Sequence, residues 1–571
     1  MQHKKIKPLL KHSIAVRTLD NYHEFLCRRY KGTLHYKFDR SRLRFSGQRD
    51  KETPSRLFRV LQHLKLIKTI DLTLWRMSYN TPNESLITAI IKRTRRAETI
   101  TIHRFNENDY SFENLSEKWP RYLLGVRKLI YEFKIGYSLM RDANRSGIPQ
   151  KIRNSLRNLK SCPKITSIIV KAPHLAKAYS VSFYEFQRYP SKTKHLIIQS
   201  KLSTEELNSS PECLKDLESI QLSLDLKDAR DSSINILTNL LDLDHLKEIS
   251  LNFAGHLGPE IPRIFTKISQ KGILKKLTLS FDYDTKDFHQ ILKAFKGSKL
   301  TQFSFKAQTT NSNQLSIIAK FLEEFGSLED LELDISNHYH FREPENLKLL
   351  SQNISKLQAL RSLRLSLRAF GNFYPKDFLP NFAGSLQNLF TKQIKLESFC
   401  IKSNQISAAE FLPSLIEIIK PASSFLHELE IDLGEYSPDK KSREKISIFM
   451  KGLQNVRVLK LVCFEISDKK LLGEIAQAVC SMKDLEVLAL GKFCKGTVTK
   501  PILFEGLKNI LKKRGLRTFE YQRDHQFADI LKNKKKISLL NLKQIMKINP
   551  SLEYTPENNL IFEAEGLPKC W

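Results

Sequence analysis

The ten residues Ser327–Ser336, SLEDLELDIS, contain the pattern on which the rest of the chain is built. Apolar side chains stand at Leu331, Leu333 and Ile335, and acidic side chains stand between them. Strict alternation is typical of a short strand with one buried face, because successive side chains of a strand point to opposite sides. Leu328 lies three residues before Leu331, so the segment has the form L-x-x-L-x-L. We therefore predict a half-buried strand here.

The same pattern recurs along most of the chain. Five successive copies, from Leu217 to Leu328, span 111 residues in four steps, a mean of about 28. Between copies the apolar residues adopt helical spacing, and Gly272, Gly297 and Gly326 suit the left-handed residue just beyond a helix end. The copies begin at Ile67, Ile100, Val126, Ile165, Leu196, Leu217, Leu246, Leu274, Leu300, Leu328, Leu360, Leu396, Leu426, Val456, Leu485 and Leu516.

Stacking explains how such units fold. One strand–turn–helix–turn unit cannot bury its own apolar face, whereas stacked units share a continuous core. We therefore predict an α/β solenoid of horseshoe shape, with parallel strands on the concave face and helices on the convex face. Residues 61–525 are assigned to a solenoid of about 16 repeats. Residues 1–60, where Leu34, Tyr36 and Phe38 indicate a strand, form an N-terminal cap region, and residues 526–571 a C-terminal cap or tail.

The L-x-x-L-x-L motif, at a period near 28 with a full helix in each repeat, resembles the ribonuclease-inhibitor-like class of leucine-rich repeat proteins. The resemblance covers roughly residues 60–525. It implies a non-catalytic module for protein–protein interaction. A more specific role that it implies is an adaptor that recognises substrates for ubiquitin ligation.

Composition agrees with a folded protein that we expect inside the cell, in the cytoplasm or the nucleus. Of the residues, 41% are hydrophobic and 27% are charged, as in folded globular chains. No apolar run is long enough to span a membrane, and the first residues lack the apolar core of a signal peptide. The eight cysteines form no C-x-x-C pair, so we expect buried, reduced thiols. We expect a monomer.

Catalytic signatures are missing from the sequence. It contains no phosphate-binding G-x-x-x-x-G-K-[ST] motif, no dinucleotide-binding glycine motif, no G-x-S-x-G and no H-E-x-x-H. His338 and His340 are spaced to share a metal, but no third ligand can be named, and solvated loop histidines are the simpler interpretation. We therefore assign no catalytic, cofactor-binding or metal-binding residue and expect no enzyme.

Charge is the most informative functional feature. The formal net charge is +33, from 94 basic and 61 acidic residues. Side chains at the fifth and seventh positions of L-x-x-L-x-L-x project from the concave sheet, and seven acidic and five basic residues stand there. The concave face is thus predicted to be neutral or slightly acidic. The acidic residues are Asp71, Glu132, Glu332, Asp334, Glu430, Asp432 and Glu520; the basic ones are Lys171, Lys306, Arg364, Lys402 and Lys460.

The concave face is the candidate site for a protein partner. A rigid surface that offers hydrogen bonds and charges suits a folded protein or an extended basic peptide, and complementary charge there supplies specificity. Solvated strand residues without a partner are the plainer alternative. The candidate contact residues are Ser250, Asn252, Thr278, Ser280, Ser304, Glu332, Asp334, Arg364, Glu430 and Asp432.

The alternative function is association with nucleic acid or other phosphates, without sequence preference, through basic outer and terminal clusters. Such clusters give salt-sensitive attraction to phosphates, although each alone is usually a solvated face. They comprise Lys92, Arg93, Arg95, Arg96, Lys512, Lys513, Arg514, Lys532, Lys534, Lys535 and Lys536.

Overall fold

The computed structural model divides into two compact units. Unit 1 contains residues 1–274 and 568–571, and unit 2 contains residues 275–567. The residues that the structure describes are 13–16, 33–38, 69–74, 98–104, 126–133, 164–171, 194–201, 215–226, 230–282, 288–307, 312–337, 344–369, 384, 386, 387, 390, 396–403, 408–433, 440–461, 469–490 and 518–521.

In unit 1 every strand from β1 to β9 pairs in parallel with the next one along the chain. The register shifts once, between Ile198 and Lys201, where β7 meets β8. The strands are β1 (Ser13–Val16), β2 (Thr33–Phe38), β3 (Thr69–Leu74), β4 (Thr99–Arg104), β5 (Lys128–Phe133), β6 (Ser167–Lys171), β7 (His195–Lys201), β8 (Ser219–Asp225) and β9 (Glu248–Ala254). The described helices are α8 (Arg230–Asn239), the 3₁₀ turn η8 (Leu240–Asp242) and α9 (Glu260–Gln270).

Unit 2 repeats the arrangement, and its strands also pair in parallel with their sequence neighbours. The strands are β10 (Lys276–Asp282), β11 (Gln302–Ala307), β12 (Asp330–Asn337), β13 (Ser362–Ala369), β14 (Ser398–Lys402), β15 (Glu428–Asp432), β16 (Val458–Leu461), β17 (Val487–Leu490) and β18 (Thr518–Tyr521). The described helices are α10 (Phe288–Ala294), α11 (Ser312–Leu322), α12 (Pro344–Ile354), α14 (Ala408–Ile419), the 3₁₀ turn η9 (Lys420–Ala422), α15 (Lys440–Gly452) and α16 (Lys469–Ser481).

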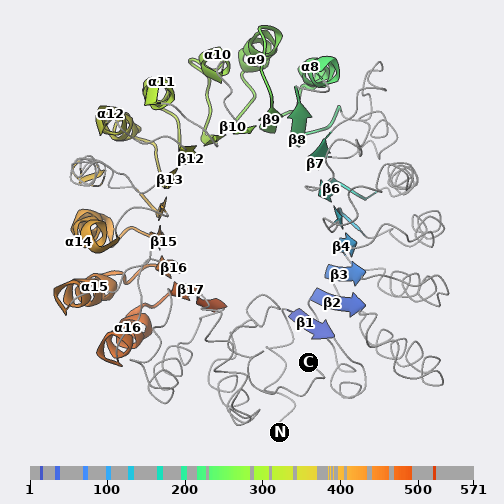
Figure 1. Ribbon diagram of the computed structural model, residues 1–571. Helices are drawn as coiled ribbons and strands as arrows, with labels where there is room; N and C mark the ends of the chain where they lie inside the picture. Colours follow the sequence, from blue (N-terminus) through green and yellow to red (C-terminus); the bar gives the residue numbers. More distant parts are fainter. Residues whose placement is uncertain are drawn as a thin grey trace, which may run out of the picture. The chain divides into compact units, whose positions relative to one another are not determined.

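The core lies between the strands and the helices. Leu333 of β12 pairs in register with Phe305 of β11 and Leu365 of β13, and all three side chains are buried. The described helices of unit 2 lie on one side of its strands (Figure 1). Phe321 and Phe325, at the end of α11, bring an aromatic pair against this core, with ring centroids 4.4 Å apart. Stacked leucines and phenylalanines thus form one continuous apolar layer within the unit.

This architecture is an α/β leucine-rich repeat solenoid, as the sequence predicts. The predicted register is confirmed within each unit, where Leu222 pairs with Leu251, and Leu279, Leu333 and Leu365 occupy equivalent places. The strand expected at residues 34–38 is β2. The boundaries at 60 and 525 stay predictions. Among the described residues, no helix is both long and apolar enough to cross a membrane.

Three local features differ from the sequence predictions. Strand β1 was not predicted, because its four residues lack the preceding leucine of the motif. Gly272 and Gly297 adopt φ of 68° and 72°, but Gly326 is not left-handed. Instead, α11 is followed by tight turns in which Phe325 N–H donates to the Leu322 carbonyl at 3.1 Å. Cys400 is buried as expected, whereas Cys480, in the last turn of α16, is exposed.

Candidate functional site

The strands of unit 2 present three rows of side chains on the face opposite the buried core, and most of these are partly exposed, whereas Ser304 and Cys400 are buried. Along β12, residues 330, 332 and 334 alternate with buried apolar residues. Register pairing joins each of these positions to its equivalents on neighbouring strands. We call the three rows together the open face. The N-terminal row is Lys276, Gln302, Asp330, Ser362, Ser398, Glu428 and Val458; the middle row is Thr278, Ser304, Glu332, Arg364, Cys400, Glu430 and Lys460; the C-terminal row is Ser280, Lys306, Asp334, Ser366, Lys402 and Asp432.

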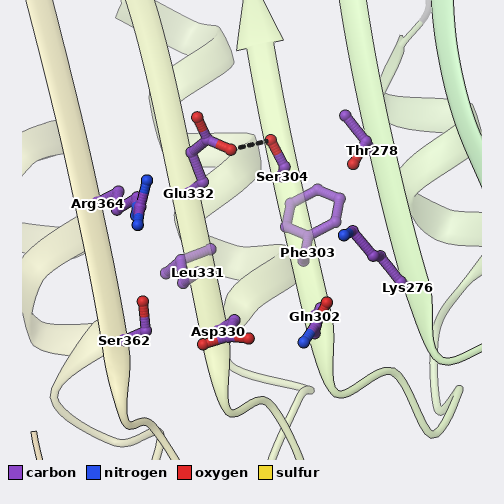
Figure 2. A pocket seen from close by; sticks show the side chains of 10 residues that line it. All are labelled: Lys276, Thr278, Gln302, Phe303, Ser304, Asp330, Leu331, Glu332, Ser362 and Arg364. Carbon is purple, nitrogen blue, oxygen red and sulfur yellow. Dashed lines mark hydrogen bonds between the residues drawn. The ribbon is translucent and has the colours of Figure 1, made fainter. Parts of the chain in front are cut away.

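Glu332 stands near the middle of an open depression of about 270 Å³ (Figure 2). Ser304 Oγ donates to one carboxylate oxygen of Glu332 at 2.8 Å, and Lys306 Nζ lies 2.9 Å from the other. Burial alone would raise the pKa of Glu332, but the bonds from Lys306 and Ser304 outweigh it and lower that pKa. Glu332 is therefore an ionised group whose charge the chain itself compensates.

Glu430 repeats this arrangement on β15. Lys402 Nζ lies 2.7 Å from one of its oxygens and Lys460 Nζ 4.0 Å from the other. Burial acts to raise the pKa of Glu430, yet the two lysines and a hydrogen bond from Cys400 lower it overall. Burial, followed by the nearby Glu430 charge, raises the pKa of the Cys400 thiol to about 12. Cys400 is thus a neutral thiol at physiological pH and not an activated nucleophile.

The aspartates of β12 have a different environment from Glu332. Burial raises the pKa of Asp330, and a hydrogen bond from Ser362 together with the charges of Arg364 and Lys276 opposes that rise only in part. At the other end of the strand, Asp334 Oδ1 is buried and has no hydrogen-bond partner. Asp330 and Asp334 form no ion pair with any residue that the structure describes. Two carboxylates of the open face therefore take no part in the ion pairs of the described residues, although Arg364 and Lys276 act on Asp330 from a greater distance.

A second depression, of about 450 Å³, adjoins the first and shares Asp330 and Ser362 with it. Oppositely charged neighbours line its edge at the start of the strands. Arg361 Nη1 lies 3.6 Å from Glu397, and Arg457 Nη2 lies 2.7 Å from Glu486. These ion pairs are partly exposed, so each contributes little to stability. Together the two depressions extend the polar surface from β10 to β17.

The open face is close to charge balance, in contrast to the chain. Its acidic members are on β12 and β15, and four of its five basic residues stand on the strands beside them, the fifth being Lys276 on β10. The formal charge of the whole chain is +33. The acidic residues are Asp330, Glu332, Asp334, Glu428, Glu430 and Asp432; the basic residues are Lys276, Lys306, Arg364, Lys402 and Lys460.

The structure brings most of the sequence-predicted contact residues onto this one face. Thr278, Ser304, Glu332 and Arg364 all line the first depression (Figure 2). Ser280, Asp334, Glu430 and Asp432 lie in the rows defined above. Ser250 and Asn252 are partly exposed on β9, which belongs to unit 1.

Sequence analysis missed the whole N-terminal row. Asp330 precedes the second leucine of the motif by one residue and lies two residues before Glu332, so period-two alternation places both on one face. The third position of L-x-x-L-x-L-x therefore projects from the same face as the fifth and the seventh. The second depression, with Arg361, Glu397 and Arg457, was not foreseen either, because it depends on which strands become neighbours.

Several predicted features lie outside the residues that the structure describes. They are His338 and His340 and the basic clusters at Lys92, Arg93, Arg95, Arg96, Lys512, Lys513, Arg514, Lys532, Lys534, Lys535 and Lys536. Across the described ranges, no group of three or more His, Cys, Asp or Glu residues is arranged to hold a metal ion.

Comparison with known proteins adds no function. No family model matches the chain, and no curated protein matches it. Among solved structures, an internalin from Listeria monocytogenes is 16% identical, with 64% of this chain and 81% of that one covered and a TM-score of 0.30. A Bacteroides fragilis protein is 12% identical, with 55% and 75% covered and a TM-score of 0.27. Neither likeness, at such TM-scores, bears on function.

Proposed function

We propose that the chain is a non-catalytic interaction scaffold whose open face in unit 2 binds a protein partner. The observation that supports this proposal is the polar character and the shape of the open face. It is a polar sheet face with two adjoining depressions, most of its side chains are partly exposed, and a packed core lies behind it. A preorganised surface of this kind loses little conformational entropy when a partner docks. Its alternating charges suit specific recognition better than general adhesion.

Three further parts of the proposal concern the class of the repeats, the location of the protein in the cell and a role in ubiquitin ligation. We assign the repeats to the ribonuclease-inhibitor-like class, because several repeats contain full helices such as α12, of 11 residues, and α14, of 12. We further propose an intracellular protein, with an adaptor role in ubiquitin ligation as the most specific version. Recovery of ubiquitin-ligase subunits with the partner would support that version, and a partner set without them would remove it.

Site-specific cross-linking tests the scaffold proposal. A photoreactive residue is placed at Ser362, which lines both depressions, in the full chain expressed in its native cell. The matched control carries the same residue at Gln352, which is exposed on α12. We expect one defined protein adduct from position 362 and none of the same mass from 352. Identical adducts from both positions, or none from 362, would contradict the proposal.

Helix α15 favours a second candidate function, binding of nucleic acid through the helical side. The open face is nearly balanced in charge, so it does not account for the surplus of the chain. Helix α15, KKSREKISIFMKG, has five basic residues and one acidic residue. Such a helix offers phosphates a salt-dependent attraction that needs no particular base sequence.

Salt titration separates this candidate from the first. Binding of the full chain to a labelled duplex DNA is measured between 50 and 200 mM salt, conditions over which phosphate contacts weaken steeply. Replacing Lys440, Lys441 and Lys451 by Gln should flatten the log–log slope by about 0.9 for each phosphate that is no longer neutralised. Ser362→Trp, on the open face, serves as the control. An unchanged slope in the lysine variant would remove α15 from the function.

A further inference from the structure

The carboxylates of β12 fall into two kinds. Glu332 is bonded at both oxygens by Lys306 and Ser304. Asp330 and Asp334, two residues to either side, form no ion pair with any described residue. Of the three acids of β12, these two therefore lack an ion-pair partner among the described residues.

The Asp334 end shows a specific deficit of hydrogen bonds. Ser366 of β13 is the register partner of Asp334. Asp334 Oδ1 and Ser366 Oγ are both buried, and neither atom has a hydrogen-bond partner. An unsatisfied buried acceptor destabilises the folded chain, so a donor supplied by a bound molecule is favoured here. The carboxylate torsion of an aspartate is broad, so Oδ1 can turn toward such a donor.

The N-terminal end of β12 also pairs an aspartate with a serine of β13. Ser362 of β13 is the register partner of Asp330 and donates a hydrogen bond to it. Burial raises the pKa of Asp330, because it outweighs the hydrogen bond from Ser362 and the charges of Arg364 and Lys276, neither of which forms an ion pair with this carboxylate. A cationic group placed beside Asp330 would remove that penalty.

The distance between the two sites is set by strand geometry. Four residues of a strand at about 3.3 Å each separate Asp330 from Asp334 by about 13 Å. In an extended guest chain, residues i and i+4 have the same separation and point to the same side. Residue i+2 of such a guest would face Glu332, whose charge is already compensated.

Resting on the proposed function, we propose that the partner binds through an extended basic segment that pairs two cationic side chains, four residues apart, with Asp330 and Asp334. The middle position of that segment is uncharged. Arginine is the better residue at the Asp334 end, because its forked donors can bond both oxygens of the Asp334 carboxylate once Oδ1 turns outward. This differs from the sequence prediction, which treated Glu332, Asp334 and Glu430 as equal contacts.

Synthetic peptides test the spacing directly on the unmodified full chain. Fluorescein-labelled nonapeptides of Ser and Thr carry two arginines at positions 3 and 7, at 3 and 5, or at 3 and 4. Binding is followed by fluorescence anisotropy. We expect the 3,7 peptide to bind about tenfold more tightly than either other peptide, a difference of about 1.4 kcal/mol. Equal affinity for all three spacings would overturn the proposal.

Protein variants test the two aspartates. Asp330→Asn with Asp334→Asn should abolish the preference for the 3,7 spacing. The control Glu323→Gln with Glu417→Gln removes the same charge from exposed, ion-paired positions on the helical side, and should keep the preference. Retention of the preference in the aspartate variant would contradict the proposal. Circular dichroism establishes that both variants are folded.

The cross-link from position 362 distinguishes two kinds of failure. If the partner adduct forms but the peptides show no spacing preference, the face binds protein and this account of its specificity is wrong. If neither the adduct nor the preference is seen, the proposed function fails as well.

Discussion

Asp330 and Glu332 stand two residues apart on the same face of β12, yet the pKa values of their carboxyl groups shift in opposite directions. Both are affected first by burial, which favours the neutral acid. Glu332 gains a lysine and a serine that more than offset burial, whereas Asp330 gains only Ser362 as a hydrogen-bond donor. Neighbours, and not residue type, decide the charge state on this face.

The raised pKa of Asp330 makes a prediction for stability. The folded chain binds a proton at Asp330 more tightly than the unfolded chain, so this group lowers stability as pH rises from the ordinary value of about 3.9 through its raised pKa. Asp330→Asn should therefore raise stability at pH 7 by up to about 0.5 kcal/mol, an amount reduced by solvent screening. Urea midpoints between pH 4 and pH 7 measure this.

The corresponding control is Glu332→Gln. The pKa of Glu332 is lowered, so its contribution is present above the ordinary glutamate pKa and is lost as pH falls through the folded value. This variant should lose about 1 kcal/mol at pH 7. A lower urea midpoint for Asp330→Asn than for the unmodified chain at pH 7 would contradict the assignment.

At the scale of single elements, two glycines in successive repeats of unit 2 differ although their sequences look alike. Gly297, after α10, has φ of 72°, and Gly326, after α11, is not left-handed. An added Cβ would meet no atom within 4 Å at either position. Any difference between them is therefore conformational.

Substitution by alanine should separate the two turns. Gly297→Ala should destabilise the chain by about 1–2 kcal/mol, because a side chain disfavours the left-handed region. Gly326→Ala should be neutral or slightly stabilising, because it restricts only the unfolded chain. Thermal unfolding of the two variants side by side is the measurement. Equal losses would show that both turns need glycine.

At the scale of the whole molecule, each repeat is stabilised mainly by core contacts with the repeats before and after it in the sequence. Phe305 of β11 is fully buried, and its ring centroid lies 5.5 Å from that of Phe281 on β10 and 5.3 Å from that of Phe288 on α10. Its register partner on the other side is Leu333 of β12. Removal of the Phe305 ring would therefore leave a cavity that borders several repeats.

Removal of that ring gives the corresponding prediction. Phe305→Ala should cost about 3–5 kcal/mol. Because each repeat contacts mainly its neighbours, hydrogen exchange should rise first in β10, β11 and β12 and least in β16. Phe425→Ala, at an exposed phenylalanine, is the control and should change little. A uniform rise in exchange along unit 2 would contradict nearest-neighbour stability.

Leucine spacing alone predicted strands β3 to β18 and their parallel order, and the buried side of strands such as β12. These features follow from local periodicity, because a strand that alternates apolar and polar residues can bury only one face and must share it with the next copy. The same alternation also predicts that residues 330, 332 and 334 of β12 share the polar face. The omission of Asp330 came from counting too few positions of the motif, and not from any lack of signal.

Pairings across strands were decided only by the tertiary structure. Nothing local distinguishes Glu332 from Asp334, but Lys306, 26 residues away along the chain, bonds the first and leaves the second unpaired. The same holds for Glu430, which two lysines from different strands compensate. Sequence determined which residues face outward, because that depends on alternation along one strand. Three-dimensional packing determined which of them remain available to a partner, because that depends on side chains brought together from separate repeats.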